Sequence, residues 1–147
     1  MAEMDDAFKI GLIIILICFA SALALWDPRS LLDGGSSPIK PKNVGDVLIG
    51  LNVSSLDWGV LSPGQSKSLE VLVNNTGQLD AVLSIKTQNW QPLEAEQFLK
   101  LTWDQEGSVI GPGKSVAASV SLKVSPWIQN IIDFNFEIMI NAEEFLG

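Results

Sequence analysis

From Val44 onward, apolar and polar residues alternate in short runs that glycine, proline and asparagine interrupt. The clearest runs span residues 47–53, 69–73, 81–86, 116–124 and 132–140. A period of two places successive side chains on opposite faces of a β-strand, so one face of each strand is apolar and becomes buried. Six or seven such strands predict a mainly β fold in which two antiparallel sheets pack together. The residues expected to fill the core or its rim are Trp58, Trp90, Trp103 and Trp127.

The last strand, residues 131–141, is the candidate for contact with a partner. Its inward set is predicted to be Ile132, Phe134, Phe136, Ile138 and Ile140, and its outward set Ile131, Asp133, Asn135, Glu137 and Met139. A terminal strand at a sheet edge leaves backbone groups unpaired, and a partner's strand can add there. The alternative, that its own domain covers this strand on both sides, stays open at this point.

Two similar segments precede alternating runs, SPGQS at residues 62–66 and GPGKS at residues 111–115. Proline followed by glycine is the requirement of a type II turn, whose third residue needs a positive φ. We therefore predict that Gly64 and Gly113 occupy turns that each start a strand. No Walker pattern accompanies either segment, so neither is expected to bind phosphate.

The stretch LDWGVLSPGQSKSLEVLVNNTG, residues 56–77, resembles immunoglobulin-like domains of the ASPM–SPD-2–Hydin and major-sperm-protein-like group. In that pattern Trp58 replaces the usual phenylalanine, and the sequence from Asn75 to Gly77 is the turn after the second strand. Residues 109–126 resemble a later segment in which a Pro-Gly turn introduces a strand that ends at a proline. The resemblance covers residues 47–124 and implies an Ig-like antiparallel β-sandwich. It implies no catalytic residues.

A run without charge extends from Ile10 to Trp26, after a short acidic tail at residues 1–9. As a helix it is about 25 Å long, near the lower limit for crossing a bilayer. Asp27 before Pro28 ends it. We predict a single transmembrane helix that binds membrane lipid. Two alternatives remain: a secretory signal cut after Ala24, which leaves a secreted ligand-binding domain, and an archaeal pilin-type signal cut near Gly11, which leaves a filament subunit.

Residues 27–43 are rich in proline, glycine and serine, and we interpret them as a spacer before a domain at residues 44–147. The orientation has two readings. The basic residues Arg29, Lys40 and Lys42 favour a cytoplasmic domain by the positive-inside rule. The sequons at Asn52 and Asn74 favour an extracellular one, with these two asparagines as glycosylation sites. We expect the domain outside the cell membrane.

The composition excludes several kinds of chemistry. The chain has no histidine, no tyrosine and one cysteine, Cys18, so histidine-based catalysis, histidine zinc sites and intrachain disulfides are excluded. A net charge of −8 argues against a nucleic-acid partner. The oxygen-rich segment at residues 104–108 lacks the ligand pattern of a calcium loop and is read as a polar hairpin. We expect that the protein is not an enzyme and that it binds no cofactor, metal or small-molecule substrate.

The layout of one N-terminal helix and a β-domain resembles archaellum stator-type subunits and short archaeal pilins. That resemblance implies a non-enzymatic, membrane-anchored structural or interaction subunit of an archaeal cell-envelope assembly. Other membrane or envelope proteins are its expected partners.

Overall fold

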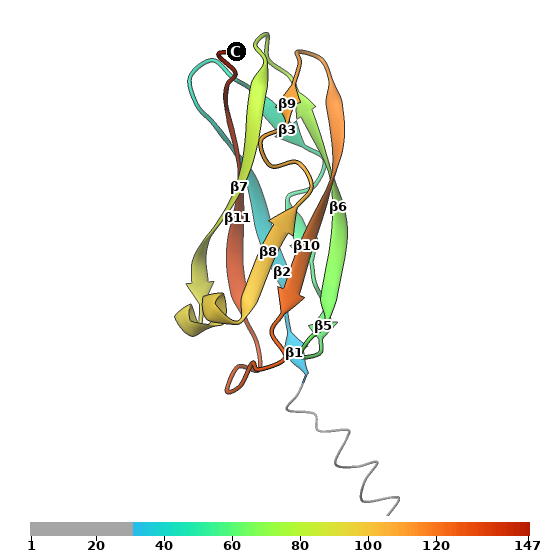
Figure 1. Cartoon of the computed structure of the whole chain (residues 1–147), viewed down its shortest axis with the longest axis vertical. Coiled ribbons are helices and arrows are strands. Elements are labelled where there is room, and N and C mark those ends of the chain that lie inside the picture. The colour runs from blue at the N-terminus through green and yellow to red at the C-terminus, as the bar shows by residue number, and fades with distance from the viewer. Residues whose placement is uncertain (1–30) are drawn as a thin grey trace, which may run out of the picture. The chain divides into compact units, whose positions relative to one another are not determined.

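Two β-sheets pack face to face around an apolar core in residues 31–147, the part of the chain that the computed structural model describes (Figure 1). The predicted tail, membrane helix and first residues of the spacer lie outside these described residues. The mainly β fold predicted from the alternation is confirmed. The only helix among the described residues is a 3₁₀ helix, η2 (Leu93–Gln97). None of residues 31–147 belongs to a helix long and apolar enough to span a membrane.

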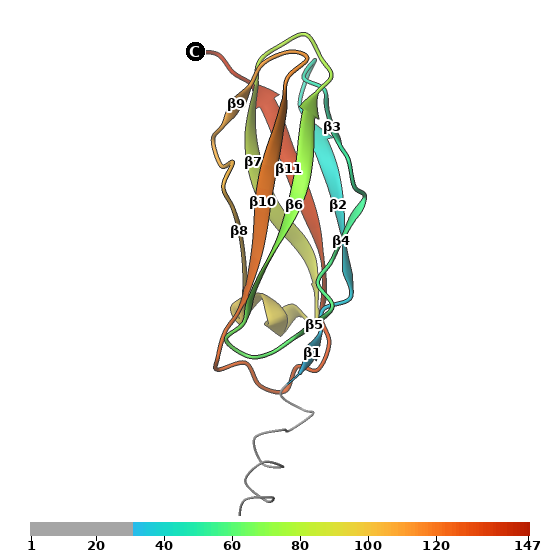
Figure 2. The same ribbon diagram turned by 90° about the vertical axis from the view of Figure 1, so that its right-hand side faces the viewer.

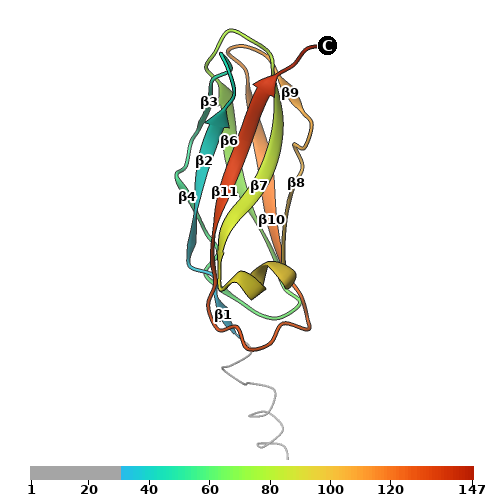
Figure 3. The ribbon, with the colours of Figure 1, turned by 90° about the vertical axis from the view of Figure 1, so that its left-hand side faces the viewer.

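Each sheet has its own strands, and strands that follow one another in the chain lie in different sheets (Figures 2 and 3). The first has the order β3 (Ile49–Leu51), β6 (Ser66–Asn75), β10 (Ser115–Val124), β8 (Leu99–Trp103). The second has the order β4 (Ser55–Asp57), β2 (Ser36–Asn43), β11 (Asn135–Glu144), β7 (Ala81–Gln91), β9 (Val109–Ile110). A small ladder joins β1 (Leu32–Asp33) to β5 (Val60–Leu61). From β2 to β11 the strands therefore alternate between the two sheets in chain order, apart from β5, which pairs with β1 alone.

The alternation predicts the core of the central strands. In β10, Ala118, Val120, Leu122 and Val124 are buried while the residues between them are partly or fully exposed. In β11, Phe136, Ile138 and Ile140 are buried as predicted. The prediction fails where β11 has not yet begun: Ile132 is 67% exposed and Ile131 is buried. Period two does not apply there because residues 131–134 form a loop and a bridge rather than a continuous strand.

The largest side chains of the core stack on one another at one end of the domain. Phe136 is fully buried, and its ring centroid lies 4.2 Å from that of Trp90 and 6.5 Å from that of Trp58. The ladder between β7 and β11 carries a bulge here, since Asn135 pairs with Gln91 and Glu137 pairs with Gln88. The one extra residue on β7 allows Trp90 to turn inward over Phe136, which a regular ladder would not do.

The two Pro-Gly turns have the predicted geometry. Gly64 has a φ of +80° and Gly113 has a φ of +73°. The N–H of Gln65 donates to the carbonyl of Ser62 at 3.0 Å, and that of Lys114 donates to the carbonyl of Gly111 at 3.1 Å. Each turn closes immediately before β6 or β10 begins, so both are scaffold.

Asn75 fixes the turn that follows β6. Its side chain is 1% exposed, and its amide donates to the carbonyls of Leu79 at 2.7 Å and Ile110 at 2.8 Å. Its oxygen accepts from the N–H of Gly77 at 3.0 Å. One buried amide therefore joins β6, the loop to β7, and β9. This is the structural reason for an asparagine at the start of the Asn-Thr-Gly segment.

The prediction of a spacer at residues 27–43 is wrong for residues 32–43, because β1 and β2 belong to the domain, which begins at Leu32. β2 pairs in parallel with β11 from Ile39 to Asn43, and it pairs with β4 at its other edge. Gly34 is not a flexible joint either. A Cβ at that position would lie 2.8 Å from Cβ of Trp58 and 2.9 Å from Cζ of Phe134. Glycine is present because two aromatic residues pack against its backbone.

Replacing Gly34 by alanine is expected to lower the free energy of unfolding by about 1–3 kcal/mol, because the added methyl group overpacks the core. Urea unfolding followed by tryptophan fluorescence measures the change. Gly35 has a φ of +50° with open space around it, so Gly35→Asn is the matched control and should cost less than about 1 kcal/mol. An unchanged midpoint for Gly34→Ala would mean that this segment is a spacer after all.

Replacing Asn75 by alanine should cost about 2–4 kcal/mol, since buried carbonyls of Leu79 and Ile110 lose their donor. The neighbouring Asn74→Ala removes a bond to Ser115 on the exposed face and should cost about 1 kcal/mol or less. The same urea experiment compares the two variants. Equal losses at both positions would contradict the organising role of Asn75.

Candidate functional site

The strand predicted to bind a partner is in the middle of its sheet. β11 pairs with β7 along its whole length and with β2 from Ile138 to Ala142. Before that, the backbone of Asp33 bonds to the residues on either side of Asp133. The prediction of an edge strand is therefore wrong: both edges of β11 are occupied by its own domain. The reason is that β1 and β2, which we predicted to be part of a spacer, lie along one side of β11.

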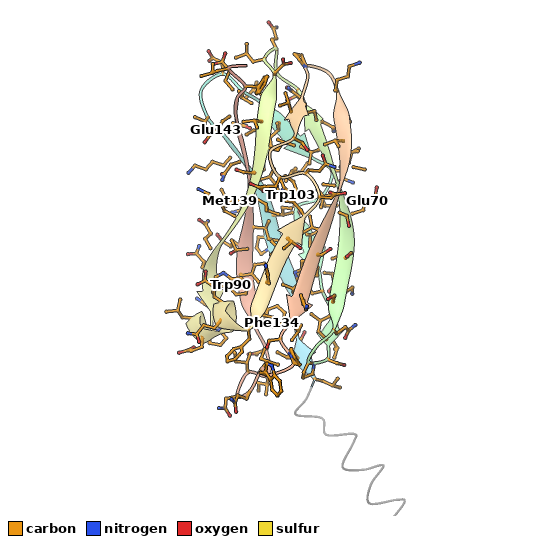
Figure 4. The ribbon with its side chains drawn as sticks, viewed as in Figure 1. Glu70, Trp90, Trp103, Phe134, Met139 and Glu143 are labelled. Carbon is orange, nitrogen blue, oxygen red and sulfur yellow. The ribbon has the colours of Figure 1, made fainter. Side chains whose placement is uncertain are left out.

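The predicted contact residues do not form one surface. Ile131 is buried, whereas Asp133 and Asn135 are exposed near the start of β11. Glu137 and Met139 are partly exposed on the outer face of the sheet. Figure 4 shows Met139 and Glu143 on this outer face and Glu70 on the outer face of the other sheet. The backbone of β11 also lies between β7 and β2, so these residues do not mark a free strand edge.

The free strand edges lie elsewhere, where β7 and β8 run next to each other. The Ser125 N–H donates to the Phe98 carbonyl at 2.7 Å, and the Asp104 N–H to the Ser119 carbonyl at 3.3 Å. In an antiparallel ladder the bonding residues alternate, so the backbone groups of Leu99, Leu101 and Trp103 point away from β10. Among the described residues no backbone hydrogen bond uses them. β8 therefore has one open edge.

The facing edge of β7 is paired only in its first half. Val82 and Ala81 pair with β9, and Leu83 exchanges bonds with Gly107 and Ser108 at 2.8 and 2.9 Å. Further along, Ile85 donates its N–H to the Glu106 carboxylate at 3.1 Å. By the same alternation, the N–H and C=O of Thr87 point away from β11, and no ladder joins β7 to β8. The sandwiched core is therefore open on this side.

A groove of about 400 Å³ occupies this opening. Its apolar lining consists of Ile85, Trp90, Leu99 and Leu101. Lys86 from β7 and Lys100 from β8 line it as exposed cations, and Glu96 of η2 lines it as well. Figure 4 labels Trp90 on β7 and Trp103 on β8, on the side of the domain where these strands run together. The groove thus combines an apolar floor, two lysines and unpaired backbone.

The two acids of the polar hairpin at residues 104–108 are held in hydrogen bonds within the domain. The Glu106 carboxylate accepts from the indole N–H of Trp103 at 2.7 Å, as well as from Ile85. The Asp104 carboxylate accepts from the Ser119 N–H at 2.8 Å. Both acids are therefore used to hold the chain where it crosses between sheets. Within residues 31–147 no group of three or more acidic or other metal-ligating residues is suitably placed to hold an ion.

The carboxylate of Glu137 is held by two side-chain amides of β7. The side-chain amide of Gln88 donates to its carboxylate at 3.0 Å and that of Asn89 at 2.9 Å. These two hydrogen bonds, with a smaller contribution from the charge of Lys40, lower the pKa of Glu137 below its usual range. The group is exposed, so this arrangement steadies the β7 bulge and does not create a reactive acid.

The predicted glycosylation sites differ in surroundings. Asn52 is exposed, and its side-chain oxygen accepts from the Leu72 N–H at 2.8 Å. Asn74 is half-buried, and its side-chain oxygen accepts from the Ser115 hydroxyl. Modification of either residue stays a prediction.

Comparison with known proteins identifies no relative: no protein-family model matches the chain, and no curated protein matches it significantly. The resemblances of residues 47–124 and of the overall layout therefore stay predictions. The groove was missed by the sequence reading, which recognised the strand at Leu99, Leu101 and Trp103 but had no way to assign its neighbours. The exposed lysines that alternate with apolar residues in both strands were the available signal.

Replacing Gln88 by alanine should raise the pKa of Glu137 toward its ordinary value, because the larger of its two hydrogen-bond contributions is lost. Since the pKa is depressed in the folded state, the interaction is present at neutral pH and is lost as the pH falls through the folded-state pKa. Carboxyl-detected NMR titration measures the change. Ser84→Ala on the same outer face of β7 is the control and should leave this pKa unchanged. No shift in Gln88→Ala would contradict the assigned cause.

Proposed function

We propose that the protein is a non-enzymatic interaction subunit that a transmembrane helix at residues 10–26 holds at a membrane. In this proposal its β-domain is an Ig-like sandwich that binds an extended strand of a partner protein in the groove between β7 and β8. The observation that carries the proposal is the pair of adjacent open edges around an apolar floor. The cell-envelope setting, the extracellular side and the archaeal source extend it as expectations from the sequence.

The occupant is a peptide strand in which apolar and acidic residues alternate. An incoming strand gains backbone hydrogen bonds from the free groups of Leu99, Leu101 and Thr87. Its inward side chains cover the apolar floor. Its outward side chains lie near Lys86 and Lys100, which favours acidic residues there. Glu96 is an acid at the η2 side of the groove, so the acidic positions of the occupant belong nearer the two lysines.

An Ig-like sandwich suits this role because its rigid core does not change when a strand joins an edge. β3 and β4 are the edge strands at one side of the domain, and β8 and β9 are the edge strands at the other (Figure 2). The β7–β8 opening lies at this second side, where β9 pairs only with Ala81 and Val82 of β7. The absence of histidine anywhere in the sequence also favours a binding role over a catalytic one.

A backbone test separates strand addition from side-chain contact. Leu101→Pro removes an N–H that faces the groove, whereas Leu101→Ala shortens the same side chain and keeps the N–H. With a ten-residue peptide of alternating valine and glutamate, we expect Leu101→Ala to bind and Leu101→Pro to lose binding. Isothermal titration of the full chain measures affinity, and amide hydrogen exchange shows whether Thr87 and Leu99 become protected. Equal binding by both variants, each shown to be folded, would exclude strand addition at β8.

The charge preference is tested in the same assay. A peptide of alternating valine and lysine should bind the natural chain about tenfold more weakly, because each exposed ion pair contributes up to about 1 kcal/mol. Exchanging Lys86 and Lys100 for glutamate should reverse the preference. Lys42→Glu and Lys114→Glu, at exposed positions outside the groove, form the matched control and should leave it unchanged. No difference between the peptides would reject the acidic occupant.

A further inference from the structure

The chain enters the domain at one end, and we call the elements there the entry end: β1, β5, η2 and the loop at residues 125–134. Leu32 pairs with Leu61, and the Asp33 N–H donates to the carbonyl of Ile132 at 2.9 Å. The pocket that joins η2 to this loop is lined by Glu94 and Asn130, among others. Figures 1 to 3 show these elements together at one end and the C-terminus at the other.

The entry end exposes large apolar side chains that the core does not use. Trp127 is 80% exposed, Leu93 72%, Ile132 67% and Val60 60%. The Trp127 backbone is held by a bond from its N–H to the Ser125 hydroxyl at 3.1 Å, so the ring is carried on an ordered turn. Tryptophan is the side chain most suited to the boundary between headgroups and acyl chains. The only charged residues in this loop and β1 are acids, Asp33 and Asp133, which gives no attraction to anionic lipid.

Chain length decides which end of the domain a bilayer could meet. Only five residues, 27–31, separate Trp26 from Leu32, and fully extended they reach about 18 Å. The opposite end also exposes apolar residues, since Val44 is 47% and Leu48 50% exposed. β11 alone has 10 residues, which span about 33 Å, so the opposite end lies farther from Leu32 than the connection at residues 27–31 can reach.

We propose that the entry end rests on the lipid interface, with Trp127, Ile132 and Leu93 among the headgroups of a zwitterionic bilayer. This inference rests on the proposed membrane anchor. It adds a second contact to the one made by the helix, and together two contacts fix the orientation of the domain. Because Glu96 of the groove lies in η2 and Leu99 follows η2 in the chain, the groove then opens close to the membrane surface.

The test uses the full chain, in which Cys18→Ser removes the single natural cysteine. A cysteine is then introduced at one other position, and an environment-sensitive fluorophore is attached to it. Gln129→Cys places the label in the loop of the entry end, and Gln78→Cys places it in the turn between β6 and β7. That turn is next to the C-terminal residues, because the Phe145 N–H donates to the carbonyl of Asp80 at 3.0 Å. The labelled chains are reconstituted into phosphatidylcholine vesicles with and without a headgroup spin-labelled lipid, which quenches nearby fluorophores. Whether the chain floats with the vesicles in a density gradient shows, independently of the quenching, whether the helix anchors it in the membrane.

We expect the label at residue 129 to shift to shorter emission wavelength and to lose most of its fluorescence to the spin-labelled lipid, while the label at residue 78 changes in neither respect. Adding Trp127→Ser and Ile132→Ser should remove at least half of the quenching at residue 129. Adding Val44→Ser and Leu48→Ser instead should leave it unchanged. A chain that floats but shows equal quenching at both labels overturns this inference alone.

Two other outcomes also overturn it. A chain that does not float rejects the membrane anchor, and this inference falls with it. A wavelength shift at residue 129 that appears without vesicles and grows with protein concentration assigns the surface to a second copy of the chain instead of to lipid.

Discussion

The stacking of aromatic rings on Phe136 is the interaction on which the rest of this domain depends. Trp90 from β7 and Trp58 from the segment between β4 and β5 both stack on it, and Phe134 lies 6.1 Å away. The indole N–H of Trp58 donates to the Ser37 hydroxyl at 3.0 Å, which ties β2 to the same cluster. With one cysteine in the chain, no intrachain disulfide can hold the sheets together. Packing of this cluster does so, and it requires Gly34 to have no side chain.

The aromatic cluster also determines which strands are central and which are open. Phe136 is fully buried under the rings that pack on it, and β7 and the β1–β2 segment lie on the two sides of its strand. β11 is consequently unavailable to a partner. The open edges belong to β7 and β8, where Trp90 turns toward Phe136 and leaves the groove beside it. A short edge strand with an exposed lysine is a usual protection against unwanted pairing, and Lys100 supplies it in β8.

The two proposals concern separate surfaces and different forces. Strand addition in the groove depends on backbone hydrogen bonds and on two lysines, whereas the entry end offers apolar side chains to a neutral lipid interface. An anchor by itself leaves a domain free to tumble at the end of its connection. A second contact near Trp127 would restrict that freedom and present the groove in one direction, which lowers the entropy cost of binding a partner.

Sequence alone determined the mainly β class, the two Pro-Gly turns at Gly64 and Gly113 and the buried faces of β10 and β11, because these follow from period two and local backbone requirements. It also excluded histidine-based catalysis and histidine zinc sites, because the chain has no histidine. Tertiary structure decided that residues 32–43 join the sheet, that Asn75 is a buried organiser and that β8 has the free edge. Each of these depends on which segment, distant in sequence, lies beside another, and on a bulge at Asn89 and Trp90 that redirects one side chain. Local pattern carries no record of such pairings, because the same alternation suits a strand with one neighbour or with two.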